Sequence, residues 1–156
     1  MKIQSHSIMS FVKVYIHFVW NTKNRHPFLS TMEIRQKVWQ HIRENAKAKE
    51  IFIDRINGYK EHCHCLISLG KQQSIQQIAQ LLKGESSHWI NNGNLWGNDR
   101  LKFSWQKEYY AVSVSESVLN KVRNYIDNQE KHHLKRTYQE EYDEFIEKYG
   151  FKITED

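Results

Sequence analysis

The sequence predicts an α+β fold built on a four-stranded antiparallel sheet. Four segments rich in β-branched and aromatic residues and two segments of helical period occur in the order strand, helix, strand, strand, helix, strand, and further helices follow. This β-α-β-β-α-β order is the ferredoxin-like or RRM-like arrangement, with helices on one face of the sheet. The length of 156 residues, 39% of them hydrophobic, fits a single domain over 1–156, with a core at about 11–133 and a C-terminal helix at about 134–150.

The first half of the chain contains three of the four predicted strands. Residues 11–20 are rich in β-branched and aromatic residues and form the first strand. Ser30 or Thr31 caps a helix in which apolar residues recur at helical spacing from Ile34 to Ala46. Residues 51–56 form the second strand, Asn57-Gly58 predicts the start of a turn, and residues 62–69 form the third strand.

The second half adds one strand and three helices. Ser74 opens a helix with apolar residues at 75, 78, 79, 81 and 82, and the Gly-, Asn- and Ser-rich residues 84–99 are expected to be irregular, although Trp89-Ile90 can extend the helix. Residues 103–114 form the fourth strand. Ser115 begins a third helix that contains Tyr125 and Gln129, and a charged helix follows at about 137–148.

Composition limits the class of protein without deciding its function. A net charge of +5 and an isoelectric point of about 9.1 are compatible with a polyanionic partner. No stretch approaches the roughly 20 apolar residues of a membrane span, so no membrane partner is expected. Cys63 and Cys65 lie two apart on a strand, too far for a relaxed disulfide, and indicate reduced core thiols in a cytoplasmic protein.

The most informative motif is the pair of histidines in the third strand. Alternate residues of a strand share a face, so His62 and His64 point the same way with Cα atoms roughly 6.5–7 Å apart, close enough for both to bind one metal ion. Cys63 and Cys65 point to the other face, which argues against a zinc site made of all four. The pair is a partial site that needs a third ligand from elsewhere.

A second motif lies in the third helix, where Tyr125 and Gln129 are one turn apart on the same face. By spacing alone, a half-buried aromatic residue beside a polar neighbour is the more frequent explanation. Together with the histidines, the pair resembles the single-tyrosine HUH transposases of small bacterial insertion sequences. The resemblance covers about residues 11–133 and rests on these anchors in order: Tyr15-Ile-His17-Phe-Val-Trp20 with Lys23, Arg25 and Pro27; His62-Cys-His64; Lys83-Gly84-Glu-Ser-Ser87; Trp105-Gln106 through Tyr110 to Ser113-Val114-Ser115; and Tyr125-Ile-x-x-Gln129 with His132-His133.

The resemblance implies a transposase that cleaves and rejoins single-stranded DNA. His62, His64 and Gln129 would hold Mg²⁺ or Mn²⁺, and Tyr125 would attack the scissile phosphate and form a 5′-phosphotyrosine. It also implies single-stranded or hairpin DNA as the partner, in a bacterial cytoplasm, and a homodimer whose active sites are shared, with Tyr125 acting in trans. One departure is Cys63, where the family usually has a larger aliphatic residue between the histidines.

Other residues support the site or have ordinary structural roles. His17 is either a core histidine or a support for the site. His132 and His133 either reach DNA phosphate or hold the metal's ligands from behind, or they form a basic helix end. Trp89, Trp96 and Trp105 are candidates for stacking on bases, with Trp105 better explained as core. For each basic candidate for DNA binding a solvated surface role is the alternative; these candidates are Lys13, Lys23, Arg25, Lys83, Arg100, Lys102 and Lys107.

Three alternatives to the transposase remain open at this point. A domesticated relative acting on chromosomal palindromic repeats shares the same chemistry. A replication or conjugation relaxase is disfavoured by the short chain and its single motif tyrosine. A catalytically inactive RRM-like RNA-binding module is disfavoured because the third strand presents histidines instead of stacking aromatics.

Overall fold

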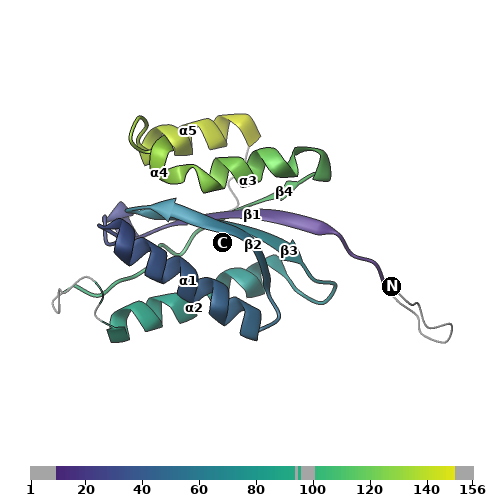
Figure 1. Cartoon of the computed structure of the whole chain (residues 1–156), viewed down its shortest axis with the longest axis horizontal. Helices are drawn as coiled ribbons and strands as arrows, with labels where there is room; N and C mark the ends of the chain where they lie inside the picture. The colour runs from purple at the N-terminus through teal and green to yellow at the C-terminus, as the bar shows by residue number, and fades with distance from the viewer. Residues whose placement is uncertain (1–9, 94, 96–100, 150–156) are drawn as a thin grey trace.

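A computed structural model describes residues 10–93, 95 and 101–149 of the chain (Figure 1). Its helices and strands follow the predicted order: β1 (Val14–Asn21), the 3-10 turn η1 (Lys23–Arg25), α1 (Met32–Ala48), β2 (Phe52–Tyr59), β3 (His62–Leu69), α2 (Ile75–Gly93), β4 (Tyr110–Val114), η2 (Glu116–Val118), α3 (Leu119–Asp127), α4 (Gln129–His132) and α5 (Tyr138–Tyr149). None of the described helices is both long and apolar enough to span a bilayer.

The strands form one antiparallel sheet in the order β2-β3-β1-β4, which confirms the predicted ferredoxin-like fold. Helices α1 and α2 pack on one face of the sheet, and α3, α4 and α5 lie over the other (Figure 1). The prediction of helices on one face therefore holds for α1 and α2, while the C-terminal helices add a third layer. Strand β3 lies in the interior of the sheet and is covered on both sides.

The alternation of side chains along β3 separates the core from the histidine face. Cys63, Cys65 and Ile67 are fully buried in the apolar cluster under α1 and α2, and both cysteines are free thiols. His62 and His64 point the other way, where Leu66 packs with residues of β4 and α3. The predicted shared face of the two histidines is thus present in the structure.

The hairpin between β2 and β3 turns later than predicted. Asn57 and Gly58 lie within β2, and the loop consists of the two residues Lys60 and Glu61, because Tyr59 pairs with His62. A Cβ atom at Gly58 would clash with the backbone oxygen of His62. Gly58 is therefore needed for close approach of the two strands at the first histidine, and not for a turn.

Helix α2 extends into the segment predicted to be irregular. It continues to Gly93, because Ser86 and Ile90 are completely buried and extend the apolar face of the helix. The Ser86 hydroxyl donates to the backbone oxygen of Leu82 at 2.6 Å and accepts a hydrogen bond from the Trp105 indole at 2.9 Å. Tertiary burial outweighs the low helix propensity of Gly84 and the serines.

The fourth strand is shorter than predicted and includes only Tyr110–Val114 of residues 103–114. The backbone of Phe103 bonds to the side chain of Asn91 on α2, with distances of 2.8 and 2.9 Å, in place of a neighbouring strand. Trp105 forms a single bridge with Thr22. The apolar residues at 103 and 105 are core residues that close one end of the sheet, as expected for Trp105.

Candidate active site

His62 and His64 of β3 belong to a buried cluster of polar side chains. Both side chains are completely buried, and their ring centroids are 5.1 Å apart. Nδ1 of His64 lies 2.9 Å from Nε2 of His17 on the neighbouring strand β1. Burial and the neighbouring His64 lower the pKa of His17 well below its usual range. His17 is therefore a buried, neutral histidine that also contacts the site through His64.

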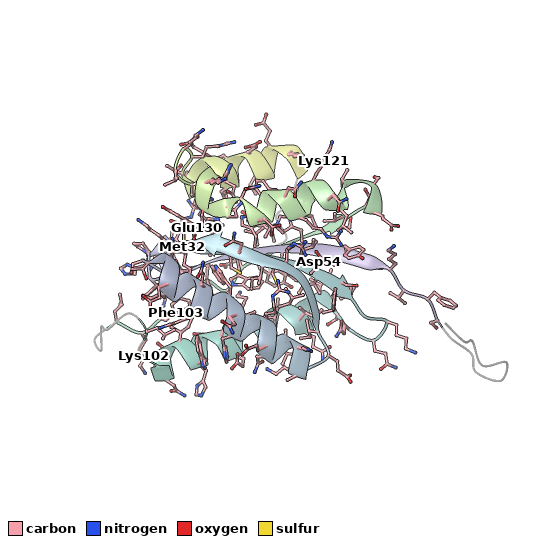
Figure 2. The ribbon with its side chains drawn as sticks, in the orientation of Figure 1. Met32, Asp54, Lys102, Phe103, Lys121 and Glu130 are labelled. Carbon is pink, nitrogen blue, oxygen red and sulfur yellow. The ribbon has the colours of Figure 1, made fainter. Side chains whose placement is uncertain are left out.

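Helix α3 is held over β2 by polar side chains of that strand. The register of β2 shifts between Ile53 and Arg55, and Asp54 lies at this irregularity (Figure 2). Asp54 binds Arg123 of α3 through two hydrogen bonds of 2.8 and 2.7 Å. The Asn57 amide donates to the backbone oxygen of Ile126 at 2.9 Å. These contacts place the next turn of the chain directly above the histidines.

A buried arginine holds α4 in the same way. Arg35 of α1 is 4% exposed and binds Glu130 through two hydrogen bonds of 2.7 and 2.9 Å. It also donates to the backbone oxygen of Leu29 and lies over the Tyr59 ring. Glu130 follows Gln129, so this ion pair fixes the residue predicted to be the third metal ligand.

Tyr125 lies at the histidine cluster of its own chain. Its ring centroid is 5.5 Å from those of His64 and His132 and 6.5 Å from that of His17. Burial and the negative charge of Glu141 raise the pKa of the Tyr125 phenol. The phenol therefore carries its proton at neutral pH. The homodimer with Tyr125 in trans stays a prediction from the sequence; in the described chain the tyrosine and the histidines meet in cis.

The predicted helix through Tyr125 and Gln129 has a break. Helix α3 ends at Asp127, Asn128 has φ −97° and ψ 15°, and α4 begins at Gln129. Backbone hydrogen bonds still run from Asn128 to Asn124 and from His133 to Gln129. The tyrosine and glutamine remain neighbours, as their spacing indicated, although they belong to two short helices.

The side-chain oxygen of Gln129 lies between two imidazoles. Gln129 Oε1 is 3.1 Å from Nε2 of His62 and 3.0 Å from Nε2 of His133. The other ring nitrogens face acceptors: Nδ1 of His62 is 2.7 Å from a carboxylate oxygen of Glu61, and Nδ1 of His133 is 3.0 Å from the backbone oxygen of Arg136. A neutral imidazole that donates from Nδ1 presents a lone pair at Nε2. Potential ligand atoms of three side chains therefore converge on one point.

Glu141 of α5 completes the cluster, and no sequence motif had indicated it. The side chain is 2% exposed, and its Oε1 accepts a hydrogen bond of 2.6 Å from Nε2 of His64. Burial tends to raise the pKa of Glu141, but His64 and the other nearby histidines hold it well below its usual range. The sequence could have indicated Glu141 as an acidic residue on the apolar side of an amphipathic helix, next to Tyr142 and one turn after Tyr138.

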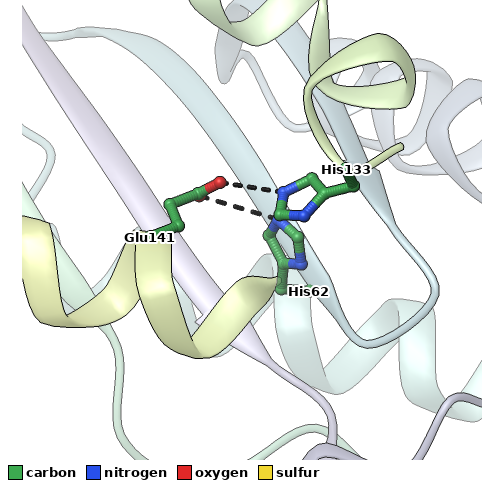
Figure 3. Close-up of side chains that lie close together, drawn as sticks. All are labelled: His62, His133 and Glu141. Atoms are coloured by element: carbon green, nitrogen blue, oxygen red, sulfur yellow. Dashed lines mark ion pairs between the residues drawn. The ribbon is translucent and has the colours of Figure 1, made fainter. Parts of the chain in front are cut away.

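These residues fit a divalent cation. His62, His133 and Glu141 offer ligand atoms that all lie within 4.8 Å of one another (Figure 3). Imidazole nitrogens with a carboxylate oxygen suit a first-row divalent ion, and each ring is oriented from behind by a second partner. Burial lowers the pKa of His64 to about 4, so this imidazole is neutral at physiological pH. Its Nε2 donates to Glu141 and its Nδ1 faces His17, so His64 borders this group of ligand atoms and orients Glu141.

The basic residues predicted to contact DNA are only partly available. Arg25 stacks over the rings of Tyr138 and Tyr142 and bonds to Gln139, so it anchors α5. Lys83 donates to the backbone oxygen of Lys107 at 2.7 Å, and burial lowers the pKa of Lys83 to about 8. Lys13 pairs with Glu116, the side chains of Lys23, Lys102 and Lys107 are exposed, and Arg100 lies outside the described residues.

The expected base-stacking role of Trp89 is not supported by its position. Its indole ring stacks on the imidazole of His41 at 3.9 Å between centroids, at the contact between α1 and α2. Trp89 is therefore engaged on the side of the sheet away from Tyr125, and Trp96 lies outside the described residues.

A cavity of about 630 Å³ opens beside Tyr125, between β4, α3 and α5. Its wall includes His17, Tyr125 and Glu141, so it reaches the histidine cluster. Three cationic side chains that no sequence motif had indicated also line it: Lys121, Arg136 and Lys148. The sequence could have indicated that Lys121 lies near Tyr125, since Lys121 is one helical turn before Tyr125 on α3.

Comparison with known families matches this arrangement. The model of the family described as "Transposase IS200 like" matches residues 10–129, which is most of the chain. The chain belongs to the IS200-like transposase family. This membership confirms the resemblance inferred from the ordered motifs, and the matched region ends at Gln129.

Individual relatives agree with the family assignment. The ISDra2 transposase TnpA of Deinococcus radiodurans is 26% identical over 119 residues, which cover 72% of this chain and 81% of the relative. A crystal structure of a candidate transposase from Deinococcus radiodurans has a TM-score of 0.58 at 24% identity and covers 83% of this chain and 98% of its own. The structure of a REP-associated tyrosine transposase bound to a REP hairpin has a TM-score of 0.58 at 19% identity. The match covers 83% of this chain and 74% of the chain in that structure. The two structures show a shared fold.

The ion pair that anchors α4 yields a stability prediction. Arg35→Ala removes both donors to Glu130 and the donor to the Leu29 carbonyl, and we expect the free energy of unfolding to fall by about 3 kcal/mol. Urea denaturation monitored by circular dichroism measures this change. The control is Lys37→Ala, which breaks an exposed pair with Glu33 on the same helix and changes stability by less than about 0.5 kcal/mol. Equal effects of the two substitutions would contradict the anchoring role.

Proposed function

We propose that this transposase cleaves and rejoins single-stranded DNA through a covalent 5′-phosphotyrosine at Tyr125, with Mg²⁺ or Mn²⁺ bound at the histidine cluster. The observation that carries the proposal is the meeting, in one chain, of a half-buried tyrosine, the buried pair His62 and His64, and the amide oxygen of Gln129. These side chains lie at the end of a cavity whose wall includes the basic residues Lys121, Arg136 and Lys148 and the acidic residues Glu141 and Glu144.

The reaction is a transesterification that conserves the phosphodiester bond energy. The Tyr125 oxygen attacks phosphorus, the bond from phosphorus to the 3′ oxygen breaks, the phenol loses its proton, and the leaving oxygen takes one up to become a 3′-hydroxyl. A second 3′-hydroxyl reverses these steps and joins new ends. When bound, the divalent cation supplies Lewis-acid polarisation of the scissile phosphate.

The chain's own residues prepare this step in three ways. The hydrogen bonds of Asp54 to Arg123 on α3 and of Arg35 to Glu130 on α4 hold Tyr125 and Gln129 in place. Little conformational entropy is therefore lost when the DNA strand binds. Burial and Glu141 raise the pKa of the Tyr125 phenol, so the phenol enters the reaction with its proton and loses it in the cleavage step. Lys121 in the cavity wall would bind backbone phosphates of the strand, and Arg136, which pairs with Glu140 and Glu144, lies in the same wall.

The DNA partner follows from the same geometry. The cavity beside Tyr125 suits an unpaired strand better than a duplex, since the nucleophile is recessed between α3 and α5. The REP-associated transposase of similar fold is bound to a hairpin, which supports hairpin DNA as the substrate here. The net charge of +5 favours binding to a polyanion.

The nucleophile is tested with Tyr125→Phe. We expect loss of cleavage and of the covalent protein–DNA adduct, by a factor of about 10³ or more, with DNA affinity nearly unchanged, because the substitution removes only the attacking oxygen. Denaturing gels with labelled oligonucleotide measure the adduct. Tyr109→Phe, on the core side of the sheet, is the matched control and should cleave normally. An adduct that persists in Tyr125→Phe or maps to Tyr109, Tyr110 or Tyr138 would refute the assignment.

The metal site is tested with His62→Ala. Loss of one buried imidazole should weaken Mn²⁺ binding at least tenfold by isothermal titration calorimetry and stop cleavage with Tyr125 intact. His41→Ala is the control, because His41 is a histidine paired with Glu85 between α1 and α2, away from the cluster. Unchanged Mn²⁺ affinity in His62→Ala, or an equal loss in His41→Ala, would count against this site.

The substrate is tested with hairpin oligonucleotides taken from the DNA that flanks the gene. We expect the single-stranded hairpin to be cleaved at least tenfold faster than the same sequence in a complete duplex, because the recessed tyrosine requires an unpaired strand. The affinity should fall steeply between about 50 and 200 mM salt, as phosphate contacts release counterions. Equal cleavage of hairpin and duplex would overturn the single-strand proposal.

A further inference from the structure

Glu141 is an unusual residue to find in this position. Its side chain is 2% exposed, whereas the neighbouring acidic side chains on α5, Glu140 and Glu144, are 56% and 59% exposed. A buried carboxylate costs several kcal/mol in desolvation unless its charge is balanced, so an apolar residue would pack here more favourably. A carboxylate at this place is explained best by a ligand that needs it.

The surroundings of Glu141 are four imidazoles. Oε1 lies 2.6 Å from Nε2 of His64 and 3.7 Å from Nε2 of His62, and Oε2 lies 2.8 Å from Nε2 of His133 and 3.2 Å from Nε2 of His132. Among the described residues, Oε2 has no hydrogen bond of acceptable geometry in spite of these short distances. Atoms that bind the same metal ion lie close together without hydrogen bonds between them. Oε2 of Glu141 is arranged in this way with the neighbouring imidazole nitrogens.

The orientation of the His133 ring also supports a metal ion beside Glu141. Its Nδ1 faces the backbone oxygen of Arg136, which can only accept, so Nδ1 donates and Nε2 is the ring nitrogen that is available to a metal ion. This nitrogen faces two oxygen atoms, Gln129 Oε1 at 3.0 Å and Glu141 Oε2 at 2.8 Å. A divalent cation among these three atoms would be coordinated by all of them.

We propose that Glu141 is the anionic ligand of the catalytic divalent cation, supplied by α5 alongside His62, His133 and Gln129. The inference rests on the proposed function and extends it. Two imidazoles and an amide are neutral, whereas Mg²⁺ and Mn²⁺ prefer oxygen ligands and are held more firmly where a carboxylate offsets their charge. The family match ends at Gln129, so α5 lies beyond the residues to which the match applies.

Contacts along α5 hold this carboxylate in place. Tyr138 stacks on the His62 ring with centroids 4.2 Å apart, and the guanidinium of Arg25 lies 5.2 and 4.7 Å from the ring centres of Tyr138 and Tyr142. Glu141 lies between these two tyrosines in the sequence, so both anchors fix the same turn of the helix. Helix α5 is accordingly a part of the metal site and not an appendage to the domain.

The experiment compares Mn²⁺ binding by the full chain and two variants. Glu141→Gln keeps the shape of the side chain and removes its charge, and we expect Mn²⁺ affinity, measured by calorimetry, to fall at least tenfold. Glu140→Gln is the matched control on the exposed side of the same helix and should bind as the wild type does. Unchanged affinity in Glu141→Gln would overturn the proposal. Tighter binding would overturn it too, since it would show that Glu141 competes with the cation.

A second measurement needs no variant and stands if Glu141→Gln fails to fold. Crystals of the wild-type protein soaked in Mn²⁺ give the ion position by anomalous diffraction. A Glu141 oxygen within about 2.3 Å of the ion supports the ligand role. A carboxylate more than about 3 Å from the ion refutes it, even where the histidines bind.

The outcomes also separate this inference from the function on which it rests. Wild-type protein that binds no Mn²⁺ defeats the metal-dependent mechanism and the Glu141 ligand together. Wild-type binding that survives in Glu141→Gln, together with loss of the covalent adduct in Tyr125→Phe, defeats the ligand role alone and leaves the proposed function in place.

Discussion

Strand β3 lies inside the sheet with helices over both of its faces, and every residue from His62 to Ile67 is buried. One face contributes Cys63 and Cys65 to the apolar core, so the other face must take the imidazoles of His62 and His64 out of water. Desolvated polar groups need partners. The helices that cover this face supply them, and the positions of α3, α4 and α5 follow from that requirement.

Polar contacts at the edges of the histidine face determine where the covering helices lie over it. Asp54 and Asn57 of β2 bind α3, and Arg35 of α1 binds α4 across the end of the sheet. These bonds are directional, whereas the apolar cluster beneath α3 contains few residues and permits sliding. Directional bonds therefore determine which side chains reach the histidines, and Tyr125 and Gln129 are the ones placed there.

The elements that were predicted correctly are those whose signal is local. Residues 62–69 form β3 as predicted, because an unbroken run of strand-forming residues sits between turn residues. The sequence offered the extension of α2 beyond Gly84 only as an alternative and did not predict the irregular path of residues 103–109, since both depend on contacts distant in sequence. Phe103 satisfies its backbone with Asn91, and Ser86 accepts from the Trp105 indole. No periodicity in either segment encodes these partners.

The amino-acid sequence was sufficient for the order of the strands, the shared face of His62 and His64, and the one-turn spacing of Tyr125 and Gln129, because strand and helix periods are properties of neighbouring residues. The tertiary structure alone placed Glu141 among the histidines, 77 residues after His64, and set Arg25 over the rings of Tyr138 and Tyr142 on α5. Which side chains meet across such distances depends on how the layers pack, and the free energy of that packing is shared by the whole domain.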